Sequence, residues 1–95
     1  MGAAKTFEDL GVSAYNGAGK LIVDPNYLLL AGKIVSVEAR HAAAIRDLLK
    51  PKSADFAGDD VVDPVTGLDV VKNPSEVLAI ADGFITTPFT AIYLP

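Results

Sequence analysis

The sequence contains no cysteine and only one histidine, His41. Without cysteine there can be no disulfide, no thiolate zinc site and no iron–sulfur cluster, so any metal site must use oxygen and nitrogen ligands. The usual redox argument about the compartment is also lost, because it depends on cysteine usage. Histidine and the carboxylates are therefore the residues that carry any metal chemistry in this chain.

Basic runs and long apolar runs are lacking as well. The eight Lys and Arg residues are scattered among twelve Asp and Glu, for a formal net charge of −4. Nucleic acid binding needs clustered basic side chains, so the sequence favours a cation or a neutral protein partner and no nucleic acid. No apolar run is long enough for a membrane span, and the opening MGAAKTFEDL lacks the layout of a signal peptide. Localisation stays unknown.

The composition is typical of a packed chain. Hydrophobic residues make up 51% of the 95 residues and charged residues 21%, which argues against intrinsic disorder. A chain of this length forms one small domain, which buries a smaller fraction of its surface than a larger protein does. A partner subunit is therefore expected.

A first helix is predicted from Ala3 to about Ile22. Three glycines lie in it, Gly11, Gly17 and Gly19, and each costs about 1 kcal/mol relative to alanine in a helix interior. Close approach of another helix backbone is the expected reason, although Gly17 and Gly19 also fit a helix end that frays toward the turn. The apolar residues recur at the helical period of three and four, at Phe7, Leu10, Ala14, Ala18 and Leu21.

A second helix is predicted from Pro25 to about Leu49. Asp24 is available as its N-cap, Pro25 suits its first position, and Pro51 ends it. The short connection to the first helix predicts an antiparallel hairpin, and hence an all-α fold. Lys33, Arg40, Arg46 and Asp47 fall mostly outside the predicted buried stripe, which consists of Leu28, Ala31, Ile34, Val35, Glu38, His41, Ala42, Ile45 and Leu49.

The amino-acid composition changes after Pro51. Residues 55–66 are rich in Asp, Gly and Pro and are predicted to form a loop, whose aspartates lack the spacing of an EF-hand and are interpreted as solvated. Asn73 and Glu76 have the form of a capping box, which predicts a short helix from about 74 to 82. The apolar end after Gly83 is predicted to be an extended arm on the bundle or on another subunit. Two regions follow, a hairpin over 1–50 and a tail over 51–95.

Glu38 and His41 are three residues apart, so they share one helical face about one turn from each other. Glu8 comes 14 residues before Ile22, roughly 21 Å, and Glu38 comes 13 residues after Pro25, roughly 20 Å. In an antiparallel hairpin both carboxylates then lie at the same level. Because carboxylate and imidazole groups suit iron and manganese, the sequence predicts a metal site at Glu8, Glu38 and His41.

Simpler interpretations of these residues stay open. His41 also fits a core histidine satisfied by hydrogen bonds, and a buried carboxylate can be paired with Lys5 or Arg40, although Arg40 points away from the Glu38 face. Tyr15 lies seven residues after Glu8. It fits a core aromatic residue, or a residue that donates a hydrogen bond to a metal ligand.

Three stretches of the sequence resemble the ferritin-like domain family that includes the desiccation-related proteins: FEDLGVSAYNGAGKLI, DPNYLLLAGKIVSVEARHAAAIRDLL and GLDVVKNPSEVLAIADGFI. The resemblance implies that these stretches are the third helix, the fourth helix and the tail of the family. It also implies that Glu8 is the third-helix glutamate, and that Glu38 and His41 are the fourth-helix Glu-x-x-His. Ferritin-like bundles hold two irons or manganeses with two such sets.

The family's first helix pair, with its own ligands, does not appear in this sequence. The resemblance therefore implies half of a four-helix bundle, completed by dimerisation, by a separate chain, or by an N-terminal half missing from a fragment. The implied function is binding or ferroxidase-like oxidation of iron at a site shared between subunits, with iron favoured and manganese as the second choice. The alternatives are a metal-free, stress-associated assembly module, or a metal site that only fixes the dimer. Family members are often exported.

Overall fold

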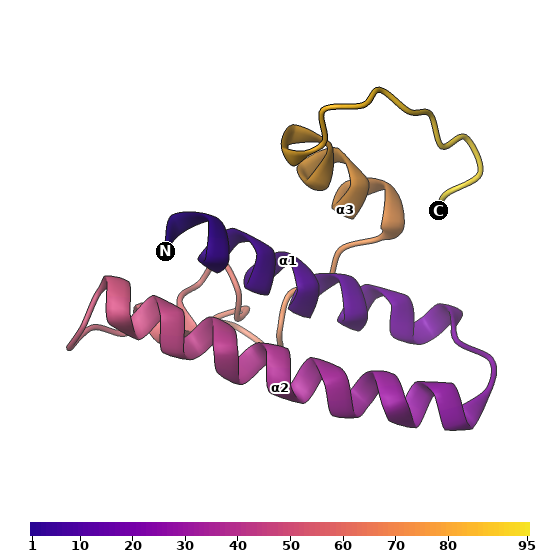
Figure 1. Cartoon of the computed structure of the whole chain (residues 1–95). Helices are drawn as coiled ribbons and strands as arrows, with labels where there is room; N and C mark the ends of the chain where they lie inside the picture. The colour runs from indigo at the N-terminus through magenta and orange to yellow at the C-terminus, as the bar shows by residue number, and fades with distance from the viewer.

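Two long antiparallel helices form the body of the computed structural model, which describes residues 1–95 (Figure 1). There is no β-strand, only an isolated bridge between Val62 and Asp69. The prediction of an all-α fold built on a helical hairpin is confirmed. The elements in chain order are α1 (Gly2–Ala18), a 3-10 turn (Gly19–Leu21), α2 (Pro25–Leu49), a 3-10 turn (Asp55–Ala57), α3 (Pro74–Ala81) and a 3-10 turn (Asp82–Phe84).

Local signals set the ends of α2. The Asp24 side chain accepts a hydrogen bond of 2.8 Å from the backbone N–H of Asn26, with Pro25 at the first position. The predicted bounds of α2 agree with the structure. The predicted end of the first helix, at about Ile22, is wrong. In the structure α1 ends at Ala18 and the chain tightens into a 3-10 turn at Gly19. Such tightening is common at helix ends.

Gly17 lets another part of the chain lie against α1. It is buried, and a Cβ built on it would lie 1.8 Å from the carbonyl oxygen of Lys72. Lys72 donates its backbone N–H to the carbonyl of Ser13 at 3.0 Å. The prediction of close backbone approach is therefore right for Gly17, but the approaching backbone is the extended segment before α3 and not a helix.

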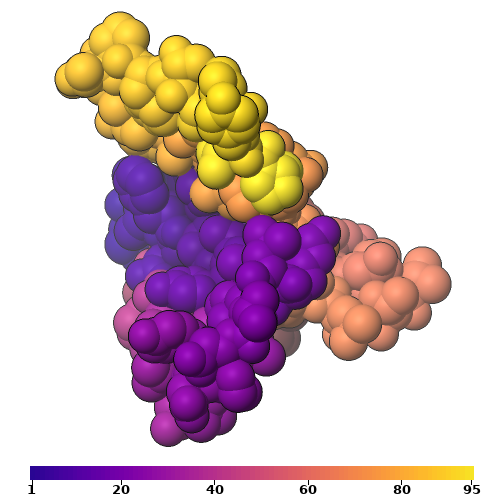
Figure 2. Space-filling model, turned by 90° about the vertical axis from the view of Figure 1, so that its right-hand side faces the viewer, coloured from indigo at the N-terminus to yellow at the C-terminus, as the bar shows by residue number.

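The segment after Lys72 forms α3 and then returns on itself. Asn73 accepts a hydrogen bond from the Glu76 backbone at 3.0 Å, while the Glu76 carboxylate accepts one from the Asn73 backbone at 2.8 Å, as in a capping box. The ring of Phe84 packs against Phe7 of α1 with 4.6 Å between centroids. In Figures 1 and 2 the C-terminal residues loop over α3, and the Pro95 carbonyl accepts the backbone N–H of Ser75 at 3.1 Å.

The hairpin alone encloses little. Only five residues are buried, and the two hydrophobic ones among them are Leu10 and Ala42. Within the chain, α1 covers one side of α2 and the loop after Pro51 covers a second. The remaining surface of α2 has no cover, so many of its large apolar side chains are exposed. None of the helices combines the length and the apolar character that crossing a membrane requires.

Gly17 gives a test of this packing. We expect Gly17→Ala to lower the free energy of unfolding by about 1–3 kcal/mol, because the new methyl group must displace the Lys72 backbone. Gly32→Ala is the matched control, since nothing lies within 4 Å of its Cβ, and it should stabilise α2 by about 0.5–1 kcal/mol. Urea denaturation followed by circular dichroism measures both. Equal effects of the two variants would contradict the close packing of residue 72 on α1.

Candidate metal centre

Glu8 of α1 and Glu38 and His41 of α2 converge in the structure. One ligand atom from each of the three side chains lies within 4.8 Å of the other two. The His41 Nδ1 atom is 3.5 Å from Glu8 Oε1. The helical spacing within α2 and the antiparallel course of α1 bring them together, as the helix lengths predicted. Their role as metal ligands stays a prediction.

The surroundings of Glu8 shift its ionisation. Its pKa is raised above the usual range, first by a hydrogen bond with Glu38, then by burial and by the negative charge of Glu38, while His41 acts in the opposite direction. A hydrogen bond between two carboxyl groups requires one of them to hold a proton. When both are ionised, Glu8 Oε2 is buried without any hydrogen-bond partner. The site therefore calls for a proton or a cation.

No lysine or arginine supplies that cation. Arg40 is exposed and donates to the hydroxyl of Ser36 at 2.9 Å, one turn back on the same helix. Neither Arg40 nor Lys5 forms an ion pair with Glu8 or Glu38. Of the partners considered from the sequence, only His41 reaches Glu8.

The three side chains lie on the open side of the hairpin. The His41 side chain is 56% exposed and that of Glu8 is 23% exposed. The Glu38 carboxylate lies against Gly11 of α1. A Cβ built on Gly11 would lie 3.9 Å from Glu38 Oε2, in ordinary van der Waals contact. Two carboxylates and one imidazole are a donor set suited to iron or manganese, with further coordination positions left for other ligands.

Tyr15 is half-buried on α1. Its hydroxyl is absent from the side-chain hydrogen bonds of the chain, which include none to Glu8, Glu38 or His41. The structure thus does not join Tyr15 to the three converging residues, and its role as a donor to a ligand stays a prediction.

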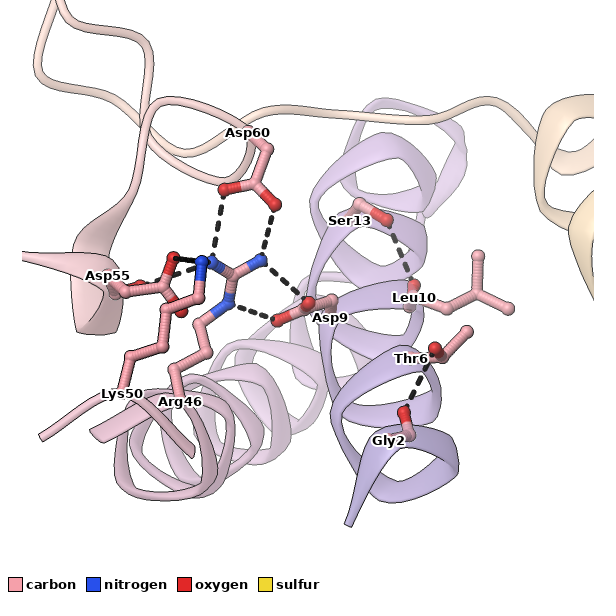
Figure 3. A network of polar contacts seen from close by, with 9 residues as sticks. All are labelled: Gly2, Thr6, Asp9, Leu10, Ser13, Arg46, Lys50, Asp55 and Asp60. Atoms are coloured by element: carbon pink, nitrogen blue, oxygen red, sulfur yellow. Dashed lines mark hydrogen bonds and ion pairs between the residues drawn. The ribbon is translucent and has the colours of Figure 1, made fainter. Parts of the chain in front are cut away.

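The sequence interpretation placed His41 in the buried stripe, but its side chain is 56% exposed. Arg46 was misplaced in the opposite sense. Predicted to lie outside the buried stripe, it is 1% exposed and forms two-pronged hydrogen bonds with Asp9, at 3.0 and 2.8 Å, and with Asp60, at 3.0 and 2.6 Å (Figure 3). It also donates to the Asp55 carbonyl at 3.1 Å. These contacts raise the pKa of Arg46 and lower that of Asp60.

This cluster joins three segments of the chain. Asp9 follows Glu8 directly on α1, Arg46 lies on α2, and Asp55 and Asp60 belong to the loop that was interpreted as solvated. The interpretation of the aspartates as solvated is wrong for Asp55, which is 20% exposed, whereas Asp60 is 63% exposed although it also binds Arg46. No periodic signal could have identified the cluster, because the loop partners follow an irregular path.

Comparison with known proteins agrees with the helical hairpin. A family model described as ferritin-like domain matches residues 1–51. No curated protein and no solved structure matches the chain. The match does not separate the desiccation-related proteins from the rest of the family, so that finer resemblance stays a prediction. Because the matched segment makes up more than half of the 95 residues, the chain belongs to the ferritin-like domain family.

Proposed function

We propose that this protein binds Fe(II), and oxidises it with dioxygen or peroxide, at a di-metal carboxylate site shared between two hairpins. The observation that supports this most is the convergence of Glu8, Glu38 and His41 within 4.8 Å, with the buried Oε2 atom of Glu8 lacking a hydrogen-bond partner. A buried carboxylate oxygen without a partner is costly, and a bound cation removes that cost.

Each side chain has a role in this proposal. Glu8 and Glu38 ligate or bridge the metal ions, and one ring nitrogen of His41 is the third protein ligand that each hairpin supplies. The bound iron would supply the electron-transfer chemistry, with manganese as the second choice of metal. The raised pKa of Glu8 means that loss of the cation favours the protonated form of this group more than in an isolated glutamate. Tyr15 is proposed as a hydrogen-bond donor to the ligands.

The two regions of the chain are proposed to divide the work. Residues 1–50 supply the ligands, while residues 51–95 pack outside the hairpin and contribute none. Ferritin-like di-metal sites are built from two Glu and two Glu-x-x-His sets, of which this hairpin has one each. The remaining set comes from a second copy or from another chain.

The exposed apolar surface of α2 favours a second candidate. A metal-free module that assembles through this surface would expose the same side chains. A site that binds metal only to fix a dimer is intermediate between the two functions.

Metal analysis after anaerobic loading separates these candidates. We expect purified protein that is loaded with Fe(II) and desalted to retain about one iron per chain, that is two for each pair of hairpins. Exposure to oxygen should then produce the near-ultraviolet absorbance of Fe(III). Chelator-treated protein is the control. A folded protein without iron would leave the assembly module, and retained iron that never oxidises would leave the site that fixes a dimer.

A further inference from the structure

One face of α2 has no partner within the chain. Its large side chains are between 39% and 70% exposed, and α1 and the loop cover other sides of the helix, where Ala42 and Arg46 are buried. The residues on the uncovered face alternate in steps of three and four, the repeat of a coiled-coil seam. This seam consists of Tyr27, Leu30, Ile34, Val37, His41, Ala44 and Leu48.

The candidate metal centre lies in the middle of this seam. His41 is one of the seam residues, and Glu38 follows Val37 directly at its edge. From Tyr27 to Leu48 the seam is roughly 32 Å long, at 1.5 Å per residue. Any helix that packs along the seam therefore also covers the open side of the metal centre.

The seam is complementary to itself. When two α2 helices run antiparallel about a twofold axis beside residue 39, Val37 faces the second copy's His41, and Ile34 faces the second copy's Ala44. Leu30 then faces the second copy's Leu48. Every seam residue except Tyr27 thus meets another seam residue, and Tyr27 comes opposite Pro51, just beyond the end of α2. Isologous twofold contacts of this kind are the commonest in homo-oligomers.

Two of the charged residues beside the seam, Lys33 and Asp47, fit the same register, whereas Arg40, halfway between them on the same flank, comes opposite the second copy's Arg40. Lys33 and Asp47 flank the seam, both are exposed, and neither forms an ion pair within the chain. In the antiparallel register Lys33 of each copy lies beside the second copy's Asp47, which gives two complementary pairs.

We propose that the partner of this face is a second copy of the chain, packed with α2 antiparallel along the seam, so that each copy contributes Glu8, Glu38 and His41 to one site. The proposal rests on the proposed function for the site, but the seam and the Lys33 and Asp47 pairs stand without any metal.

Charge exchange tests the register. In sedimentation equilibrium of the full chain, we expect a dimer for the unchanged protein. Lys33→Asp alone or Asp47→Lys alone should each weaken the dimer about tenfold, because two pairs become repulsive. The double variant Lys33→Asp, Asp47→Lys should restore it. A monomer at all concentrations, or a double variant no better than the single ones, would overturn the proposal.

A matched pair of leucines tests the face. Leu30→Asp should abolish the dimer, because it places a charge in the seam. Leu29→Asp, also an exposed leucine but outside the seam, should leave the dimer unchanged. Circular dichroism of each variant shows whether the helices are intact. Equal loss of the dimer in both variants would contradict the proposal.

Repeating these measurements without metal separates this proposal from the proposed function. A dimer that follows the predicted charge pattern but retains no iron supports the seam and contradicts the iron site. A monomer that retains iron contradicts the seam and leaves iron binding in place.

Discussion

Arg46→Ala is expected to destabilise the folded chain by about 3–5 kcal/mol, the usual effect of removing one partner from a buried ion pair. The substitution leaves Asp9 and Asp60 without their ion-pair partner. Asp55 keeps only the exposed Lys50 at 4.0 Å, and the contacts that hold the loop onto both helices are removed. A domain of this size has a total stability on the order of 5–14 kcal/mol. The loss is therefore a large fraction of the whole.

Urea denaturation at neutral pH measures this effect, with Arg40→Ala as the matched control. Arg40 is an exposed arginine on the same helix, and its side chain donates only to Ser36 one turn away. Its removal should change the stability by less than about 0.5 kcal/mol. Should the two variants have the same unfolding midpoint, the Asp cluster around Arg46 contributes nothing in solution.

The double variant Glu38→Ala, His41→Ala is expected to retain only background iron after anaerobic loading, compared with about one iron per chain in the unchanged protein. It removes two of the three donor atoms that converge in each hairpin. Elemental analysis after desalting measures the result. Loss of the proposed iron oxidation should accompany it, since no other cluster of histidine and carboxylates lies in the chain.

Unfolding would not explain that result. Neither side chain is fully buried, and their removal takes away both the repulsion between Glu38 and Glu8 and the contacts of Glu38 and His41 with Glu8. Alanine also favours the helix more than histidine does. The melting temperature of the double variant should therefore stay close to that of the unchanged protein.

The control for nonspecific iron is Asp59→Ala, Asp82→Ala. These two carboxylates are exposed and form no ion pair, so their removal changes the net charge without touching the three converging residues. Retained iron should stay at about one per chain in this control. An equal fall in both double variants would mean that iron binds to scattered surface carboxylates.

Sequence alone was sufficient wherever neighbouring residues decide the structure. Asp24 and Pro25 start α2, and Asn73 and Glu76 form the box that starts α3, as predicted, because each cap satisfies backbone groups two or three residues away. The meeting of Glu8 with Glu38 and His41 followed from helix rise and one short connection. The ferritin-like family was identifiable for the same reason, since its characteristic residues lie at fixed spacings on two regular helices.

Only the tertiary structure decided which side chains become buried through distant contacts. Arg46 binds Asp9 across 37 residues of chain, and Gly17 packs against Lys72 of an irregular segment. Such contacts depend on the path of the loop after Pro51, which has no period to follow. The sequence by itself therefore determined the helices and the level at which the carboxylates meet, whereas long-range packing determined the buried arginine cluster and the face of α2 left uncovered.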